Sequence, residues 1–530
     1  MSEFLNSIGY MSWVLPALLA IPMAGAALIW LTPTPRRRGL VPGADEVMSG
    51  LANGPRWLAF IVLLVEFIVS VGLWWTFDPG VVQWQAPFDI PWIPSWGVRF
   101  TLGIDGIALM MILLTTSIMV LSVLGSWTGV RTRTHGYYSL MLIMTSGMLG
   151  VFMALDLFLF YVMWEVMLVP MYFIIGIWGG ERRIYASVKF FIYTMVGSLL
   201  MLVAIVYLGL AGADPRTGIP NFSYDQILAT VRVTPTAALW LFGAFFLAFA
   251  VKVPMFPFHT WLPDAHVEAP TAGSVVLAGI MLKLGTFGFI RLAVPLFPEA
   301  AMREDVRAVI LGLAVIGIIY GALVSLVQPD FKKLVAYSSV SHLGFVMLGI
   351  FALTVESVQG ALLVMINHGI STGALFFLVG MIYERRHTRM IEAYGGIART
   401  VPLFATLLTV VSLSSIGVPG TNGFVGEFLV LVGSFKTRPV LAVISGTAVI
   451  FAAAYLLWAI QRILFNPLDK PENKHIPDLN RRELALMVPL IAGIVWLGVY
   501  PAPVLRRMEG AATRFVQQVE TRAFRGFAER

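Results

Sequence analysis

Two lysines lie deep within apolar stretches of the sequence. Lys252 stands past the middle of the stretch 237–261, and Lys283 is central in the stretch 271–294. A lysine near the centre of a bilayer costs at least about 2.5–3.5 kcal/mol, so it usually has a charged partner or a water-filled cavity. Both lysines are too far from the ends of their stretches to extend the amine to the membrane surface. We therefore predict a functional role for both, and the chemistry open to a buried amine is the gain and loss of a proton.

Carboxylates and imidazoles occur at mid-depth in four other apolar stretches. The carboxylates are Glu165, within MWEVM, and Glu427, four residues after the sequence GVPGTNG. The imidazoles are His342 and His368, and they are flanked by side chains that could hold water: Ser338, Ser341, Asn367, Ser371 and Thr372. Histidine titrates near neutral pH. Two interpretations of each histidine stay equally open, a proton-relay member or a core residue with satisfied hydrogen bonds.

A further polar cluster follows the first lysine and consists of His259, Asp264, His266 and Glu268. Its spacing resembles that of metal ligands, but Pro263 interrupts it and it lies at the mouth of an apolar stretch. We therefore predict no metal site in this chain. His259 is retained as a possible relay member, alongside the two histidines above.

The composition of the chain is that of a membrane protein. Of its 530 residues, 58% are hydrophobic and only 12% are charged, which leaves too little polar surface for a soluble fold. Fourteen apolar stretches are long enough, at about 17–25 residues each, to cross a bilayer as helices. The predicted fold class is an all-α integral membrane protein with about 14 transmembrane helices. The chain has no cysteine, which excludes disulfides, thiolate zinc and cysteine-bound iron–sulfur clusters within it.

Two of the predicted helices are interrupted. Pro254 and Pro257 break the seventh directly after Lys252, and a proline with three glycines breaks the twelfth (402–433) within GVPGTNG. Lys252 would then end the first half of helix seven, and Glu427 would lie in the first turn after the second break. The C-terminal end of a helix dipole favours a cation such as Lys252, and the N-terminal end favours an anion such as Glu427.

The two breaks are five helices apart. Because five is odd, two five-helix units that end on similar broken helices would have opposite orientations in the membrane, as in many secondary transporters. We therefore predict two inverted five-helix repeats, made of helices 4–8 and 9–13. The chain would divide into residues 1–135 (helices 1–3), 136–294 (first repeat), 306–465 (second repeat) and 466–530 (a loop, helix 14 and a C-terminal tail).

The loop charges predict the orientation of the chain. With the N-terminus outside, 20 of the 36 Lys and Arg residues fall in inside loops, among them Arg36, Arg37 and Arg38, and eight fall in outside loops. Positive residues are enriched in inside loops, so both termini are predicted on the outer side. Lys332 and Lys333 are interpreted as ordinary inside-loop charges. Two alternatives are predicted for the tail from residue 504 onward. It forms a basic amphipathic helix that lies on the membrane or on a partner protein, or it is disordered.

Three tracts carry a resemblance to a known family. They are VKVP followed by HTWLPDAHVEAPTAGSVVLAGIMLK (259–283), the MWE around Glu165, and FKKLVAYSSVSHLGF (331–345). They resemble the antiporter-like membrane subunits of respiratory NADH:quinone oxidoreductase (complex I) and of related multisubunit cation/proton antiporters. The resemblance extends from about helix 4 to helix 13. One of the three large complex I paralogues has glutamate on the second broken helix, where subunits L and N have lysine. Glu427 and the chain length indicate the glutamate-bearing paralogue.

The resemblance implies a proton path in the membrane plane, from Glu165 paired with Lys252, through Lys283, to Glu427. Burial disfavours the charged form of a lysine and a nearby carboxylate favours it, so movement of Glu165 relative to Lys252 would switch proton affinity. Two half-channels, one to each face, would make the relay a pump. Its energy would come from quinone reduction in partner subunits, because this chain has no evident redox-cofactor site.

The resemblance also implies the surroundings of the chain. We expect it in the bacterial inner (plasma) membrane, with the other membrane subunits of complex I as partners, including L, N and the small subunits, and the hydrophilic redox arm as an indirect partner. No cofactor is expected in this chain, whereas FMN, iron–sulfur clusters and quinone are expected in partner subunits. The sequence has no phosphate-binding loop, dinucleotide fingerprint or nucleic-acid motif, so no nucleic-acid partner is expected.

Two alternative functions stay open at this level. One is a subunit of a multisubunit antiporter that exchanges Na⁺ for H⁺ without redox chemistry. The other is a membrane electron carrier that binds haem through His342 and His368. Co-purifying flavin and iron–sulfur subunits would distinguish the complex I subunit from the antiporter, and a haem absorbance band would indicate the electron carrier.

Overall fold

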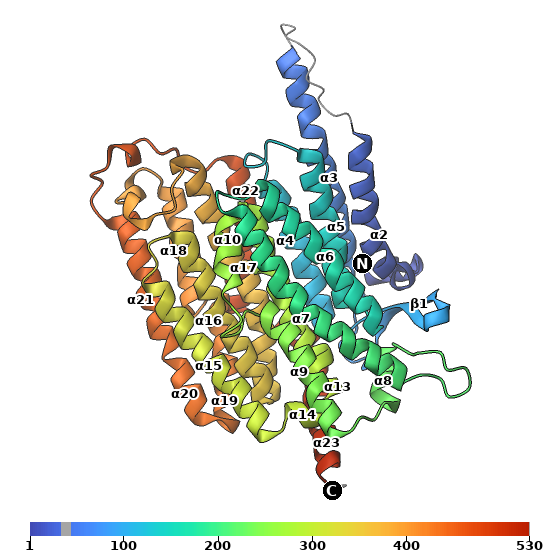
Figure 1. The fold of residues 1–530 in the computed structure, drawn as a ribbon. Coiled ribbons are helices and arrows are strands. Elements are labelled where there is room, and N and C mark those ends of the chain that lie inside the picture. Colours follow the sequence, from blue (N-terminus) through green and yellow to red (C-terminus); the bar gives the residue numbers. More distant parts are fainter. Residues whose placement is uncertain (33–43, 529–530) are drawn as a thin grey trace.

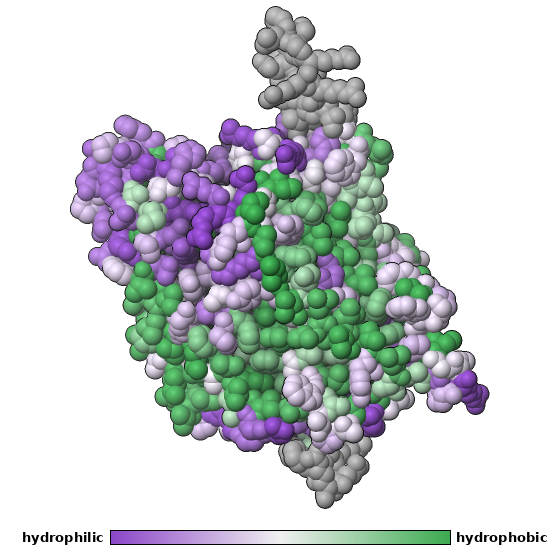
Figure 2. Space-filling view, in the orientation of Figure 1, coloured by the Kyte–Doolittle hydropathy of each residue, from purple (hydrophilic) through white to green (hydrophobic). Residues whose placement is uncertain are grey.

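The computed structural model describes residues 1–32 and 44–528, and of residues 44–52 and 524–528 it describes the backbone alone. Arg36, Arg37 and Arg38 lie outside the described residues. Within the described part of the chain, 13 helices are long and apolar enough to cross a membrane. A broken helix, α18 (Pro402–Ile416) with α19 (Asn422–Thr437), completes the predicted fourteen. Figure 2 shows an apolar band between two more hydrophilic ends, as a membrane-spanning protein requires.

In the first quarter of the chain, the first helices and the strands lie at one side of the molecule, and the last helix, α4, lies nearer its middle (Figure 1). Its elements are α1 (Ser2–Ser7), α2 (Tyr10–Leu31), α3 (Ala44–Thr76), β1 (Gln85–Ile93), the 3₁₀ turn η1 (Pro94–Trp96), β2 (Val98–Ile104) and α4 (Gly106–Gly125).

The next part holds the first broken helix and the segment that carries Lys283. Its elements are α5 (Thr134–Met153), α6 (Leu157–Trp178), α7 (Arg183–Ala211), α8 (Tyr224–Thr230), α9 (Pro235–Lys252), α10 (Trp261–Glu268), α11 (Thr271–Val276), η2 (Leu277–Met281), α12 (Leu282–Gly288), η3 (Phe289–Ala293), α13 (Val294–Leu296) and α14 (Pro298–Ala301).

The remaining helices extend to the opposite side of the molecule, where α20 and α21 lie (Figure 1). Besides α18 and α19, the elements are α15 (Glu304–Leu326), α16 (Phe331–Ala352), α17 (Val355–Arg386), η4 (Ile391–Ala393), η5 (Ile397–Arg399), α20 (Pro439–Gly446), α21 (Ala448–Ile460), η6 (Gln461–Phe465), η7 (Pro471–Asn473), α22 (Arg481–Val499) and α23 (Ala502–Ala528). The inverted relation between helices 4–8 and 9–13 stays a prediction.

A two-stranded antiparallel hairpin, β1–β2, is the element that the all-α prediction missed. Helix three was predicted from Leu102, but residues 98–104 form β2 and α4 begins at Gly106. Asp105 explains this start, because its carboxylate accepts the N–H groups of Ile107 and Ala108. Such an N-cap satisfies backbone donors that a helix start leaves free.

Both predicted helix breaks are confirmed. The first half helix, α9, ends at Lys252, and α10 begins only at Trp261. In the second break, Gly417 and Gly420 have φ angles of +85° and +91°. Glycine adopts this left-handed region without the penalty of a Cβ atom, which is why the chain can stop one helix and start another here.

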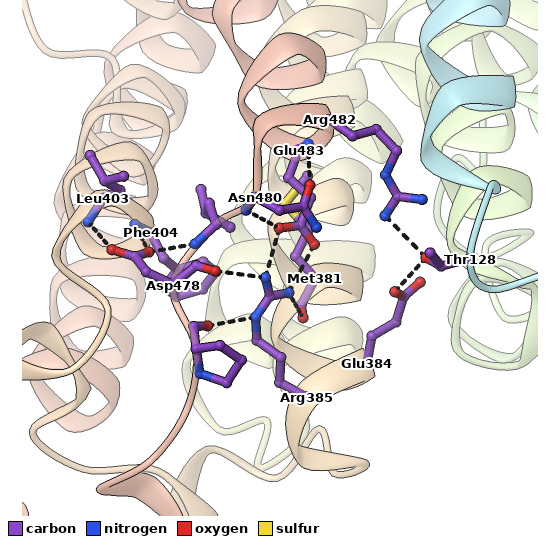
Figure 3. Close-up of polar contacts among 12 residues, drawn as sticks. Thr128, Met381, Glu384, Arg385, Leu403, Phe404, Asp478, Asn480, Arg482 and Glu483 are labelled. Carbon is purple, nitrogen blue, oxygen red and sulfur yellow. Dashed lines mark hydrogen bonds and ion pairs between the residues drawn. The ribbon is translucent and has the colours of Figure 1, made fainter.

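The N-terminal end of the second broken helix is held by the loop before α22 (Figure 3). The Asp478 carboxylate accepts the backbone N–H groups of Leu403 and Phe404, the first free donors of α18, at 2.9 and 3.1 Å. Arg385, at the end of α17, binds Glu483 of α22 through two hydrogen bonds of 2.9 and 2.6 Å. Together these contacts fix the ends of α17, α18 and α22 relative to one another.

The C-terminal tail forms the helix α23, so the alternative of a disordered tail is wrong. The predicted helix was expected on the membrane or on a partner, whereas α23 packs on its own chain. Its apolar residues Met508, Ala512, Phe515 and Val519 are buried, and it packs on α4 and α17. The tail therefore lies against its own chain, because its apolar face is covered by these helices.

Candidate functional site

Lys283 lies on a membrane segment that is not a uniform α-helix. The π-helical segments η2 and η3 flank the short helix α12, which contains the lysine. A π turn disturbs the regular hydrogen bonding of backbone carbonyls and is frequent at functional sites. The Lys283 amine donates a hydrogen bond to the carbonyl of Ala278, in η2. The irregular helix thus gives a fully buried amine an acceptor inside its own segment.

A line of four side chains connects Lys283 with Glu427, with hydrogen-bond contacts at its two ends and a ring contact between the two histidines in its middle. Lys283 Nζ lies 2.7 Å from His368 Nδ1. The rings of His368 and His342 have centroids 5.8 Å apart in an edge-to-face arrangement. His342 Nδ1 lies 2.7 Å from Glu427 Oε1. The four side chains come from α12, α17, α16 and α19, so the packing of these helices assembles the line.

A small polar cavity lies beside the two histidines. It has a volume of about 20 Å³ and is lined by His342, His368, Asn367, Ser371, Thr372 and Glu427, among others. This is room for about one water molecule. Asn367, Ser371 and Thr372 thus lie where the sequence predicts. Ser338 and Ser341 do not line this cavity, and their hydroxyls donate to the carbonyls of Val335 and Ile318.

The predicted position of Glu427 in the helix is wrong. Glu427 was expected in the first turn after the break, but α19 begins at Asn422 and has no acidic residue in its first turn. The effect of a helix dipole falls off within that turn. The partner of the Glu427 carboxylate is therefore the imidazole of His342.

Lys252 is fully buried in an aromatic environment. Its ammonium nitrogen lies 5.6 Å from the ring centroid of Trp164 and 5.3 Å from that of Phe190, distances at which a ring face attracts a cation. Among the described residues, the Lys252 amine has no hydrogen-bond partner. Glu165 is near enough to act on its charge, but no direct ion pair joins the two side chains in the described structure. The predicted pair is therefore a charge interaction across a gap.

His259 lies apart from the line between Lys283 and Glu427. Its Nε2 is 3.3 Å from the hydroxyl of Tyr320, and its ring stacks on Phe256. The two carboxylates of the metal-like cluster have separate partners. Asp264 forms an ion pair with Lys189 at 2.8 Å, and Glu268 accepts the backbone N–H of Arg182 at 2.9 Å. Within the described residues, no group of three His, Asp or Glu side chains is arranged to hold a metal ion.

The interpretation of Lys332 as an ordinary loop charge is wrong. Lys332 is only 6% exposed, and its Nζ donates to the carbonyl of Ala269 at 2.7 Å, just beyond the end of α10. A cation is stabilised at a helix C-terminus. Lys333, by contrast, is half-buried. The adjacent basic pair in the sequence gave no sign that one member points into the protein.

His266 is the second residue whose position the sequence did not reveal. It is fully buried, stacks on Phe376 with ring centroids 4.6 Å apart, and has no hydrogen-bond partner for either ring nitrogen among the described residues. Its ring lies within electrostatic range of both Lys332 and Lys283. The only sequence signal was its place in the polar cluster after the first break.

The chain matches a known family and named relatives. A sequence model of the NADH:quinone oxidoreductase/Mrp antiporter transmembrane family matches residues 154–452, more than half of the chain. NADH-quinone oxidoreductase subunit M of Rhodobacter capsulatus is 43% identical over 509 residues, which cover 95% of this chain and 96% of that protein. The subunit M of Escherichia coli (strain K12) is 41% identical over 505 residues, 93% of this chain and 95% of that protein.

Solved structures give the same result. A chain of respiratory complex I from Thermus thermophilus with bound NADH superimposes with a TM-score of 0.83 at 33% sequence identity, over 96% of this chain and 99% of that one. A chain of the Mrp complex from Dietzia superimposes with a TM-score of 0.77 over 95% of this chain and 52% of that one, but at 23% identity it shows a shared fold alone.

These matches establish the class of protein: the chain belongs to the proton-translocating, antiporter-like membrane subunits of NADH:quinone oxidoreductase. Within this class, its relatives of 41–43% identity bear the name subunit M. The prediction from Glu427 is thereby confirmed, as are the predicted multi-pass membrane location and the preference for complex I over a separate antiporter.

Proposed function

We propose that this chain moves protons through the line Lys283, His368, His342 and Glu427, under the control of the charge pair Glu165 and Lys252. The supporting observation is the series of contacts along the line, which are 2.7 Å at both ends and an edge-to-face contact of the two imidazole rings in the middle. Imidazole can accept a proton at one ring nitrogen and release one from the other, and it titrates near neutral pH. The cavity beside the two rings has room for one water molecule, which would carry the proton from one ring to the other.

Lys252 controls the relay through its charge. Its aromatic surroundings supply no hydrogen-bond acceptor among the described residues, so the nearby Glu165 carboxylate is the main stabiliser of its proton. When Glu165 moves away, the amine loses that stabilisation and its proton becomes easier to release. Loss or gain of charge on Lys252 then changes the electrostatic field at the rest of the line.

The source of energy is quinone reduction in partner subunits, which also hold the FMN and iron–sulfur clusters. Both termini lie on the outer side of the bacterial inner membrane in this proposal. Glu427 then lies on the outward half of the second broken helix, because helix twelve runs from inside to outside. Glu427 is therefore the group that releases protons toward the outer half-channel.

Purification of the complex through a tag on this chain tests the assembly. We expect flavin, iron–sulfur and quinone-reactive subunits to co-purify in stoichiometric amounts, detected by absorbance and mass spectrometry. Recovery of a stable multisubunit assembly that exchanges Na⁺ for H⁺ and contains no flavin would contradict the proposal.

Glu165→Gln tests the control pair. The variant keeps the size of the side chain but removes the charge that holds the proton on Lys252. We therefore expect proton pumping in an assembled complex to be roughly tenfold slower. This loss is smaller than the contribution of about 10²–10⁴-fold that a direct proton-transfer group makes. Pumping is measured with a pH-gradient dye in sealed vesicles, beside the quinone reductase rate. Glu181→Gln, in an inside loop, is the control. An assembled Glu165→Gln complex with the parent's rates would remove Glu165 from the mechanism.

A further inference from the structure

The second helix break is closed by a network of buried polar side chains. Asn422, the first residue of α19, is fully buried. Its Oδ1 accepts the hydroxyl of Ser371, on α17, at 3.1 Å, and it also accepts the hydroxyl of Ser414, on α18. The two hydroxyl oxygens are 2.8 Å apart. One amide oxygen therefore joins both halves of the broken helix to α17.

Two glycines allow the helices to approach closely around this network. A Cβ atom at Gly423 would lie 1.9 Å from the carbonyl oxygen of Ser414, so the end of α18 and the start of α19 meet backbone to backbone. A Cβ atom at Gly426 would lie 3.0 Å from the backbone nitrogen of Val364 and 3.2 Å from Asn367 Nδ2. The start of α19 is thus packed directly on the part of α17 that carries Asn367.

Asn367 extends the network to the proposed relay, because it precedes His368 on α17. Its Nδ2 donates a hydrogen bond to the backbone carbonyl of Asn422. A carbonyl oxygen can only accept, so this contact determines which end of the Asn367 amide is the nitrogen. The amide oxygen, Oδ1, has no hydrogen-bond partner among the described residues, although Asn367 is only 3% exposed. A buried acceptor of this kind calls for a partner, and an ordered water is a common one.

Three such polar atoms belong to residues that line the small cavity beside the two histidines. They are Asn367 Oδ1, His368 Nε2 and Ser415 Oγ, and none has a hydrogen-bond partner among the described residues. His342 lines the same cavity. A buried water makes about two to four hydrogen bonds to polar groups that are otherwise unsatisfied. The cavity, with a volume of about 20 Å³, therefore has both the room and the partners for a single water molecule.

The hydrogen-bond roles of these groups orient that water. The ammonium of Lys283 can only donate to His368 Nδ1, so the hydrogen of the His368 ring is on Nε2, which donates to the water. Asn367 Oδ1 can only accept, so it takes one hydrogen of the water. The second hydrogen is left for His342, whose Nδ1 faces Glu427 and whose Nε2 is the remaining ring nitrogen.

We propose that Asn367 is a positioning residue that holds this water between the two rings of the relay. The proton on His368 Nε2 moves to the water while the water passes its second hydrogen to His342 Nε2, so the water is regenerated and stays bound to Asn367 Oδ1. The backbone carbonyl of Asn422 keeps the amide in the required orientation. The inference rests on the proposed relay and adds the group that orients its central step.

A map of the purified parent complex, at a resolution that shows ordered waters, is the first test. We expect density for one water in the cavity, within about 2.5–3.2 Å of both Asn367 Oδ1 and His368 Nε2. This test needs no variant. A well-ordered map of the region without a water, or with a water that does not contact Asn367, would overturn the proposal.

Two substitutions at Asn367 distinguish water binding from packing. Asn367→Leu keeps the branched shape of the side chain but removes the amide oxygen, so we expect an assembled complex that pumps roughly tenfold slower, part of the 10²–10⁴-fold that a positioned proton-transfer group contributes. Asn367→Ala leaves room for a second water in place of the amide and should slow pumping less. A residue that only packs predicts the opposite order, because alanine leaves a void that leucine fills. That opposite order would overturn the proposal.

Heavy water supplies a readout that a packing defect does not change. In the Asn367→Leu complex, proton transfer between the rings limits the rate, so replacement of H₂O by D₂O should lower its pumping by a larger fraction than it lowers the parent's. Gln461→Leu, at an exposed amide in η6, is the control and should match the parent in both solvents. An equal fractional loss in Asn367→Leu and the parent would count against the assigned role of Asn367.

The outcomes separate the water site from the relay. If Lys283→Met abolishes pumping while Asn367→Leu pumps at the parent's rate, the relay stands and the role of Asn367 is wrong. If Lys283→Met pumps normally, the relay itself fails. If Asn367→Leu does not assemble, the map of the parent complex decides.

Discussion

Replacement of Lys283 by methionine should abolish proton pumping while the complex still assembles. Methionine has nearly the length of lysine and is apolar, so at a fully buried site it removes the cost of about 2.5–3.5 kcal/mol for a lysine in the membrane. The contact of 2.7 Å with His368 Nδ1 is lost, and with it the first proton carrier of the line. We expect pumping to fall by at least about 10²-fold, the contribution of one positioned proton-transfer group.

The measurement compares the pH gradient formed by sealed vesicles with the quinone reductase rate and with the amount of assembled complex. Lys436→Met is the matched control, because Lys436 is an exposed lysine paired with Glu356 at the surface, where an ion pair contributes about 0–1 kcal/mol. Loss of assembly in Lys283→Met would show a structural role for the amine, and normal pumping would exclude Lys283 from the relay.

Replacement of Glu427 by glutamine should have the second largest effect. Glutamine keeps an oxygen at the position that lies 2.7 Å from His342 Nδ1, so the helix contact between α16 and α19 is preserved. It cannot take up and release a proton. The outward end of the line is then closed, and we expect pumping in the assembled complex to fall by roughly 10²-fold, as for the loss of any positioned acid or base.

Two further variants at this position distinguish the carboxylate from the space that it fills. Glu427→Asp keeps the acid one methylene farther from His342 and should retain part of the pumping. Glu427→Lys should also keep part of it, because lysine stands at this place in the resembling paralogues and can titrate when desolvated. Parent-level pumping by Glu427→Gln, measured with a pH-gradient dye, would place the outer exit at another residue.

The sequence alone determined the class of fold and the positions of the deep charges. Lys252, Lys283 and Glu427 are evident in one dimension, because a charge inside a long apolar stretch conflicts with the low polarity of the bilayer core wherever the helices pack. The two breaks are evident for the same reason, since proline and glycine act on the local backbone. The resemblance then identified the family, and Glu427 identified the paralogue within it.

Only the tertiary structure decided which of these groups meet. Lys283 and His368 are 85 residues apart in the chain, and so are His342 and Glu427, so each contact depends on how α17 packs on η2 and how α16 packs on α19. The inward position of Lys332 depends on the end of α10, which attracts the cation. Nothing in the local sequence distinguishes Lys332 from Lys333, because burial is set by neighbours that are distant in the chain.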